Sequence, residues 1–191
     1  MVYFVMEKQL NTVGSSTYEK IKHDIIFGEL APGSKLKLDV IKTKYEASVS
    51  TLRETLNRLA SEGFVLAEEQ RGFFVTKVSK EDLTEVAKLR VLLECHALKT
   101  SVENGDADWE GNLVAAHHKL QLMEKKMISG DSSEKETWKR YDWEFHLAVI
   151  QACNSRNLLE LHSTLYDKYL RYHCLLYTSD AADDTPCVDL G

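Results

Sequence analysis

One stretch, residues 47–64, limits what this chain can fold into, because its apolar residues repeat with the period of a helix. At 100° per residue, Leu52, Leu56, Leu59 and Ala60 fall on one face. The opposite face collects the polar side chains Arg53, Glu54, Asn57, Arg58 and Ser61. The pattern predicts an amphipathic helix of about three turns that buries one face and exposes the other.

The beginning of this helix carries small hydroxyl residues. Ser50 or Thr51 is predicted to cap it, and Thr51 followed by Glu54 fits a capping box. Hydroxyl groups and an arginine at a helix N-terminus suit contacts with phosphate groups and base edges. An ordinary surface helix, in which Glu54 and Arg58 pair across one turn, explains the same stretch about equally well.

The neighbouring segments favour the first interpretation. They predict a helix at 17–30, a short strand at 34–38, a helix at 40–45 and two strands at 64–66 and 73–78. The two strands flank a polar turn in which Gly72 is available for a positive φ. Three helices followed by a hairpin make a winged helix, whose third helix enters the major groove while the hairpin reaches the flanking DNA.

From residue 79 onward the sequence predicts helices and no strands. The expected helices span residues 81–103, 109–128, 134–153 and 157–172. On the third of them, the side chains predicted to face inward are Trp138, Tyr141, Phe145, Val149 and Ala152. The fold class is therefore mainly α, a winged helix followed by an antiparallel helical bundle. The predicted domains are an arm (1–16), a winged helix (17–78), a helical domain (79–173) and a tail (174–191).

Charge and composition agree with this division. The chain has a net charge of −6, yet residues 17–80 hold eleven Lys or Arg against nine Asp or Glu. A mildly basic head on an acidic body permits DNA binding. No apolar run is long enough to span a membrane. The four cysteines lack a CxxC spacing and fit reduced thiols in a cytoplasmic protein.

Several motifs together resemble the GntR family of winged-helix transcription regulators. In the first half they are Pro32-Gly33, Leu36, residues 48–59, Glu62-Gly63 and residues 71–75. In the second half Asp82-Leu83, Leu89-Arg90, Glu94, Asp142, Phe145-His146 and residues 154–158 resemble the all-helical FadR-type effector domain, called FCD. The resemblance implies a bacterial repressor that binds a near-palindromic DNA operator as a homodimer and is released by a small carboxylate metabolite.

The resemblance also implies which residues meet each partner. Ser48, Ser50, Thr51, Arg53 and the wing glycine Gly72 align with residues that approach DNA. The full predicted DNA-binding set is Ser48, Val49, Ser50, Thr51, Arg53, Asn57, Arg58, Arg71 and Gly72. Arg90 is predicted to lie in the effector pocket. The chain departs from the family at Val49, where an arginine is common, and near Asp39, where a basic residue is common.

Asp142 and His146 lie four residues apart on a predicted helix, so both can lean into one cavity of the bundle. From the residues alone, a buried hydrogen-bonded pair is favoured over a site for zinc, nickel or manganese. The resemblance favours the metal, because many FCD domains add two later histidines. His162 and His173 do not fit that setting. His117 is predicted to pack in the core and His118 to be solvated.

The segment after His173 shares nothing with the family and has no helical period. It looks like translated adapter sequence, with a native disordered tail as the alternative, and the effector domain is expected to be cut and its metal site incomplete. Two rival functions are a metal-dependent hydrolase using Asp142 and His146, and a winged helix used only for protein contacts. The first lacks a nucleophile or base at useful spacing, and the exposed arginines argue against the second.

Overall fold

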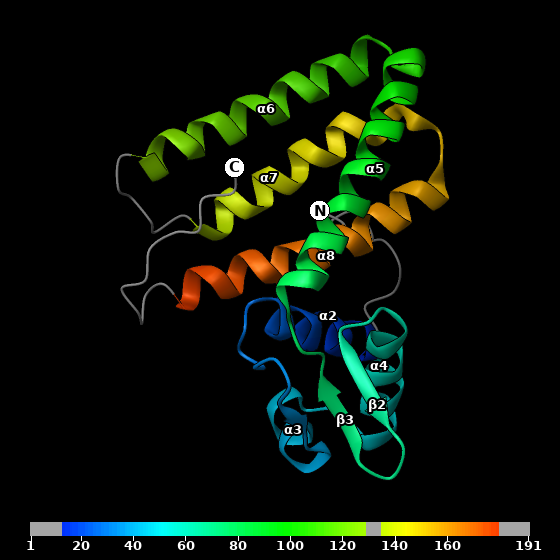
Figure 1. Cartoon of the computed structure of the whole chain (residues 1–191), viewed down its shortest axis with the longest axis vertical. Helices are drawn as coiled ribbons and strands as arrows, with labels where there is room; N and C mark the ends of the chain where they lie inside the picture. The colour runs from blue at the N-terminus through cyan, green and yellow to red at the C-terminus, as the bar shows by residue number, and fades with distance from the viewer. Residues whose placement is uncertain (1–12, 129–134, 180–191) are drawn as a thin grey trace. The chain divides into compact units, whose positions relative to one another are not determined.

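The computed structural model describes residues 13–128 and 135–179, and its elements alternate much as the sequence predicts (Figure 1). In order they are α2 (Val13–Ile26), β1 (Lys35–Leu36), α3 (Leu38–Tyr45), α4 (Val49–Ser61), β2 (Val65–Glu68), β3 (Gly72–Val75), α5 (Lys80–Asn104), α6 (Ala107–Ile128), α7 (Lys135–Ile150), the short 3-10 helix η1 (Gln151–Cys153) and α8 (Arg156–Ser179). The predicted mainly α fold, with a winged helix before a helical bundle, is confirmed.

The chain forms two compact units. We call residues 13–83 together with 167–179 the head unit, and Thr84–Tyr166 the helical unit. Helix α8 therefore contributes its first half to the helical unit and its second half to the head unit. No helix among the described residues is long and apolar enough to cross a membrane.

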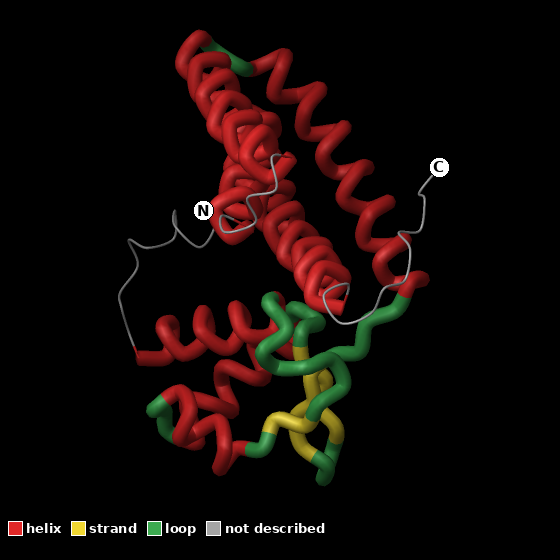
Figure 2. The backbone as a smooth tube through the Cα atoms, turned by 90° about the vertical axis from the view of Figure 1, so that its left-hand side faces the viewer, coloured by secondary structure: helices red, strands yellow, loops and turns green. Residues whose placement is uncertain are grey.

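The head unit is a winged helix with a small antiparallel sheet, in the strand order β1-β3-β2 (Figure 2). Glu68 pairs with Gly72 beside the turn of the hairpin, and Lys35 of β1 pairs with Phe74. The helices cover the sheet with the apolar stripes that the sequence predicts. The largest fully buried side chains of this core are Ile21, Ile25, Ile26, Leu52, Leu56, Leu59, Phe64 and Val75.

The second half of α8 completes this core. Cys174 is buried in the same cluster as the winged-helix residues, and Leu170 packs against it. Tyr172 donates a hydrogen bond to Asp82, and burial, followed by that bond, raises the pKa of Tyr172 to about 12. The expectation of a non-helical segment from 174 thus differs from the structure over 174–179, where α8 continues, while 180–191 lie outside the described residues.

The predicted arm is also shorter than expected, because residues 13–16 belong to α2 and the remaining residues of the arm lie outside the described part.

In the helical unit, the residues predicted to face inward from the third helix are less buried than expected. The five side chains expected inside are only half-buried, whereas Trp143, Ala148 and Ile150 are buried. The reason is that α7 is contacted from more than one side. Trp109 of α6 donates a hydrogen bond to the carbonyl of Ala148, and the Trp143 ring stacks on His162 of α8. A helix covered on several sides has no single apolar stripe.

Other core assignments in this unit also fail. Leu98, a core candidate, is 39% exposed, and the buried positions of α5 include Arg90 instead. His117, expected in the core, is exposed and meets the ring of Phe145, whereas His118 is exposed as expected.

Candidate DNA-binding surface and effector site

Helix α4 begins with a cap different from the one predicted. Ser48 is the N-cap residue, and its hydroxyl accepts a hydrogen bond of 3.1 Å from the amide of Thr51. The capping box of Thr51 and Glu54 is therefore wrong. The Ser48 hydroxyl also lies 2.8 Å from the hydroxyls of Ser50 and Thr51. Three hydroxyl groups thus gather at the first turn, where the helix amides and dipole favour an anion.

The outward face of α4 carries the predicted polar side chains. Arg53, Glu54 and Asn57 are exposed, one to two turns beyond the hydroxyl cluster. Val49 stands beside them and is 37% exposed. Within the described residues no ion pair involves Arg53, so its guanidinium projects from the surface available for a partner.

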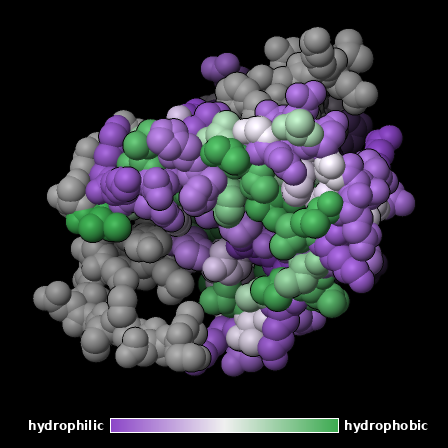
Figure 3. Space-filling view, turned by 90° about the horizontal axis from the view of Figure 1, so that it is seen from above, coloured by the Kyte–Doolittle hydropathy of each residue, from purple (hydrophilic) through white to green (hydrophobic). Residues whose placement is uncertain are grey.

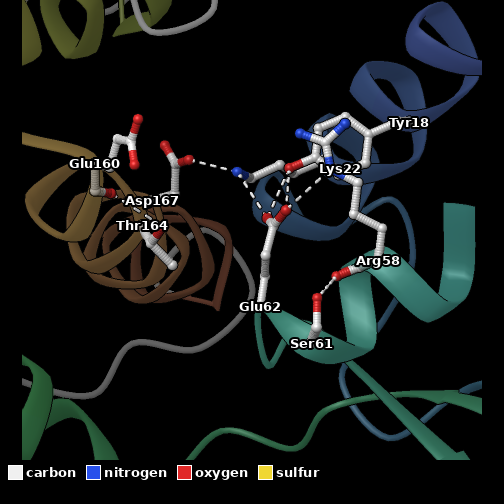
Figure 4. A network of polar contacts seen from close by, with 8 residues as sticks. All are labelled: Tyr18, Lys22, Arg58, Ser61, Glu62, Glu160, Thr164 and Asp167. Carbon is white, nitrogen blue, oxygen red and sulfur yellow. Dashed lines mark hydrogen bonds and ion pairs between the residues drawn. The ribbon is translucent and has the colours of Figure 1, made fainter. Parts of the chain in front are cut away.

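Arg58 does not form the pair that the surface-helix alternative predicts. It pairs with Glu62, at 3.4 Å, rather than with Glu54. Its guanidinium also lies 3.7 Å from the centre of the Tyr18 ring (Figure 4). The ring contact directs Arg58 toward α2, because Tyr18 lies on that helix, and Glu62 at the end of α4 accepts a hydrogen bond from the same Tyr18. Arg58 therefore braces α4 against α2, and its predicted DNA contact stays a prediction.

Behind α4 lies a buried ionic network that the sequence analysis did not find (Figure 4). The ammonium of Lys22 lies 2.7 Å from Asp167 and 3.2 Å from Glu62, and Tyr18 donates a hydrogen bond to Glu62. Burial opposes the charge on Lys22, but Asp167, Tyr18 and Glu62 hold the pKa of Lys22 above its ordinary value. The network joins α2, the end of α4 and α8, and so fixes how α4 is presented.

At the wing, Gly72 has a φ of +95°, which confirms the positive φ predicted from the sequence. Arg71 is exposed and forms an ion pair with Glu68 across the turn. Its guanidinium lies 5.6 Å from the centre of the Phe74 ring. The predicted wing residues are therefore at the exposed tip of the hairpin, with the charge of Arg71 partly balanced.

In the helical unit the predicted effector and metal residues come together. Asp142 and His146 lie 3.7 Å apart, and Asp142 accepts a hydrogen bond of 2.5 Å from Tyr166. The other ring nitrogen of His146 lies 3.2 Å from Glu94. Glu94 also accepts a 2.6 Å bond from the predicted effector residue Arg90. The result is a half-buried polar cluster rather than an isolated pair.

The centre of this cluster is Glu94, which the sequence analysis quoted only as part of a motif. Burial opposes its charge, but hydrogen bonds from His146, His162 and Arg90 hold the pKa of Glu94 well below its usual range. His162 is fully buried at 2.8 Å from Glu94, and its other ring nitrogen has no hydrogen-bond partner within the described part of the chain. Glu94 and His162 are separated by 68 positions in the sequence, which leaves no local pattern from which this contact could be predicted.

These residues do not complete a metal site. Over residues 13–128 and 135–179, no three His, Cys, Asp or Glu side chains are arranged to hold an ion together. The predicted ligands Asp142 and His146 supply two donors, and both already meet protein partners. A tight zinc site in a protein takes at least three ligands. The expected incomplete site stays a prediction, and no metal chemistry is assigned to this cluster.

Comparison with known proteins identifies both halves of the chain. Residues 14–75 match the family described as bacterial regulatory proteins, gntR family, and residues 85–188 match the FCD domain. Over 160 residues the chain is 38% identical to the uncharacterized HTH-type transcriptional regulator BphR of Paraburkholderia xenovorans, covering 84% of this chain and 65% of that protein. It therefore spans slightly less than two-thirds of that relative.

Two further comparisons agree. The chain is 31% identical over 157 residues to the HTH-type transcriptional repressor GlaR of Escherichia coli, covering 81% of this chain and 70% of that protein. The solved structure of E. coli McbR/YncC matches with a TM-score of 0.69 and 25% identity, over 89% of this chain and 77% of that one. These relatives are regulators of transcription and not enzymes, so the hydrolase alternative is not supported. The chain belongs to the GntR family of transcriptional regulators, in the subfamily with an FCD effector-binding domain.

Proposed function

We propose that this chain is a bacterial, cytoplasmic repressor that binds a near-palindromic operator as a homodimer and leaves it when a small carboxylate binds the helical unit. The observation that carries the DNA-binding part is the exposed first turn of α4. Its hydroxyl cluster suits a phosphate group, and Arg53 suits a phosphate or a guanine edge. Helix α4 would lie in the major groove with the wing against the flanking DNA.

The operator can be found without knowing the gene that is controlled. The 191-residue chain is incubated with random duplexes, and bound sequences are enriched and read. We expect inverted repeats whose half-sites are separated by about one helical turn. Enrichment of single half-sites would contradict the dimeric part of the proposal. No enrichment at all would contradict operator binding.

The effector part rests on the cluster around Arg90. Its guanidinium is held by Glu94 at 2.6 Å and lies 4.9 Å from the centre of the Tyr166 ring. A carboxylate of a metabolite has the same chemistry as Glu94 and would compete for Arg90. His162, whose Nε2 contacts the same Glu94, has a second ring nitrogen without a partner among the described residues, and this atom offers a further polar contact.

A panel of mono-, di- and tricarboxylic acids tests this part against the selected operator. We expect one class to release wild-type protein, and Arg90→Lys to bind DNA normally but resist release, because lysine lacks the planar fork of arginine. The matched control Lys88→Ala alters an exposed residue of the same helix and should respond like wild type. Equal release of Arg90→Lys and wild type would contradict the role of Arg90.

The dimer is supported by apolar side chains on the surface of α5. Val91, Leu98 and Val102 are 60%, 39% and 65% exposed, and their spacing of seven and four residues places them on one face. Figure 3 shows hydrophobic patches between polar side chains on the face that it presents. A second copy offers the same apolar stripe in return. Light scattering should give twice the chain mass, and Val102→Lys should lower it.

A further inference from the structure

Two of the arginines predicted to bind DNA are held by side chains of this chain. Arg71 is paired with Glu68, and Arg58 is paired with Glu62 and stacked on Tyr18. Phosphate contacts supply much of the affinity of a DNA-binding protein, so an unpaired cation near the wing would add to the contact made by Arg53.

Lys35 of β1 occupies such a position. It pairs with Phe74 across the sheet, and its ammonium lies 5.6 Å from the centre of the Phe74 ring. Its side chain also runs beside the wing glycine, since a Cβ on Gly72 would lie 3.9 Å from Cε of Lys35. Lys35 is exposed, and no ion pair found among the described residues includes it. Its ammonium therefore lies at the wing, over the same ring as Arg71.

The strand adds a second lysine on the same side. Leu36 is 4% exposed and points into the core, so its neighbours Lys35 and Lys37 point outward. Lys37 has an extended backbone and directly precedes α3, the first helix of the helix-turn-helix. The alternation of polar and apolar residues in this segment thus places two lysines in a row between the wing and α3.

We propose that Lys35 and Lys37 form a second backbone contact with the duplex that α4 reads, and that Lys35 rather than Arg71 is the phosphate-binding cation of the wing. This inference rests on the proposed binding of DNA by α4. A lysine ammonium meets a phosphate as a point charge without reading sequence. The contact therefore strengthens binding to every sequence and sets the register of the protein on the duplex.

The salt dependence of binding tests the inference. Fluorescence anisotropy measures affinity for a labelled duplex of arbitrary sequence between about 0.05 and 0.2 M NaCl. Lys35→Ala and Lys37→Ala should each lower the slope of log K against log salt by about 1, and weaken binding on arbitrary and selected duplexes alike. Arg71→Ala should leave the slope close to wild type. Lys99→Ala, an exposed lysine of α5, is the matched control.

Further variants test whether the ion pair with Glu68 keeps Arg71 from binding phosphate. Glu68→Gln removes the carboxylate that holds Arg71 and should raise affinity, by making that guanidinium available. Lys35→Gln, which keeps a long polar side chain on the strand, should reproduce the loss seen with Lys35→Ala. Far-ultraviolet circular dichroism confirms that each variant is folded.

Arg53→Ala distinguishes DNA binding by α4 from the additional contact of Lys35 and Lys37. If it weakens operator binding while Lys35→Ala and Lys37→Ala keep the wild-type slope, the lysine contact is overturned and the assignment of α4 stands. A slope lowered by Arg71→Ala and not by Lys35→Ala would overturn it too. If wild-type protein does not bind DNA, or Arg53→Ala binds the operator as wild type does, the proposed function and the inference fall together.

Discussion

Replacing Lys22 by methionine should destabilise the head unit strongly. The side chains of Lys22 and Asp167 are only 9% and 11% exposed, and their charged atoms lie 2.7 Å apart. Methionine keeps most of the volume of the lysine stem but leaves the Asp167 carboxylate buried without a cation. Breaking one side of a buried pair costs about 3–5 kcal/mol, a large part of the roughly 5–15 kcal/mol that stabilises a domain.

The stability lost in Lys22→Met comes mainly from the desolvated Asp167 carboxylate that is left without a cation. A double variant measures this contribution. In Lys22→Met/Asp167→Leu the buried carboxylate is gone, so most of the lost stability should return. The exposed pair of Arg156 and Glu160 on α8 provides the control, since water screens it and Arg156→Ala should leave the unfolding midpoint unchanged.

Urea unfolding by circular dichroism measures the free energy of the whole chain. All three tryptophans lie in the helical unit, so their fluorescence follows that unit separately. A loss below about 1 kcal/mol in Lys22→Met, or a double variant no more stable than the single one, would refute the argument that this network is a buried, mutually dependent ion pair.

Three further predictions concern the wing, pH and metal. Gly72→Val should weaken operator binding with unchanged circular dichroism, because valine is strained at a φ of +95°; an unfolded variant would make the glycine purely structural. Burial opposes the charge of Asp24, but hydrogen bonds from Lys44 and Tyr45 lower its pKa, so this stabilisation exists above the ordinary pKa and is lost in acid. Asp24→Asn should therefore be less stable than wild type at neutral pH, and the difference in unfolding midpoint should shrink as the pH falls below the ordinary pKa of an aspartate, about 4, and vanish only below the lowered pKa of the folded state. Zinc titrated calorimetrically should bind this chain weakly, and tight one-to-one binding abolished by His146→Ala would contradict that.

Local patterns predicted the winged helix well because its core is built from single-faced elements. Leu52, Leu56 and Leu59 repeat at helical spacing and are all fully buried. The N-cap residue of α4 was predicted wrongly because Ser48, Ser50 and Thr51 are all residue types that can cap a helix. Which of them caps the helix depends on the residue at which the helix begins. Ala47 is buried, and α4 begins directly after the next residue, Ser48.

The sequence predicted less where contacts join distant residues. Lys22 on α2 meets Asp167 on α8, and no helical period carries information about such a pair. The same holds for Glu94 and His162 in the effector cluster. Asp142 and His146 were found because they lie one helical turn apart, but their partners Tyr166 and Glu94 come from other helices.

Arg53 carries the central claim that α4 reads DNA, so its contribution to operator affinity is the most direct test. Affinity for the selected operator is measured at fixed salt for wild type, Arg53→Ala and Arg156→Ala, the last an exposed arginine of the helical unit. We predict a loss of about 1–3 kcal/mol for Arg53→Ala and none for Arg156→Ala. Equal affinity of wild type and Arg53→Ala would contradict the assignment of α4 as the recognition helix.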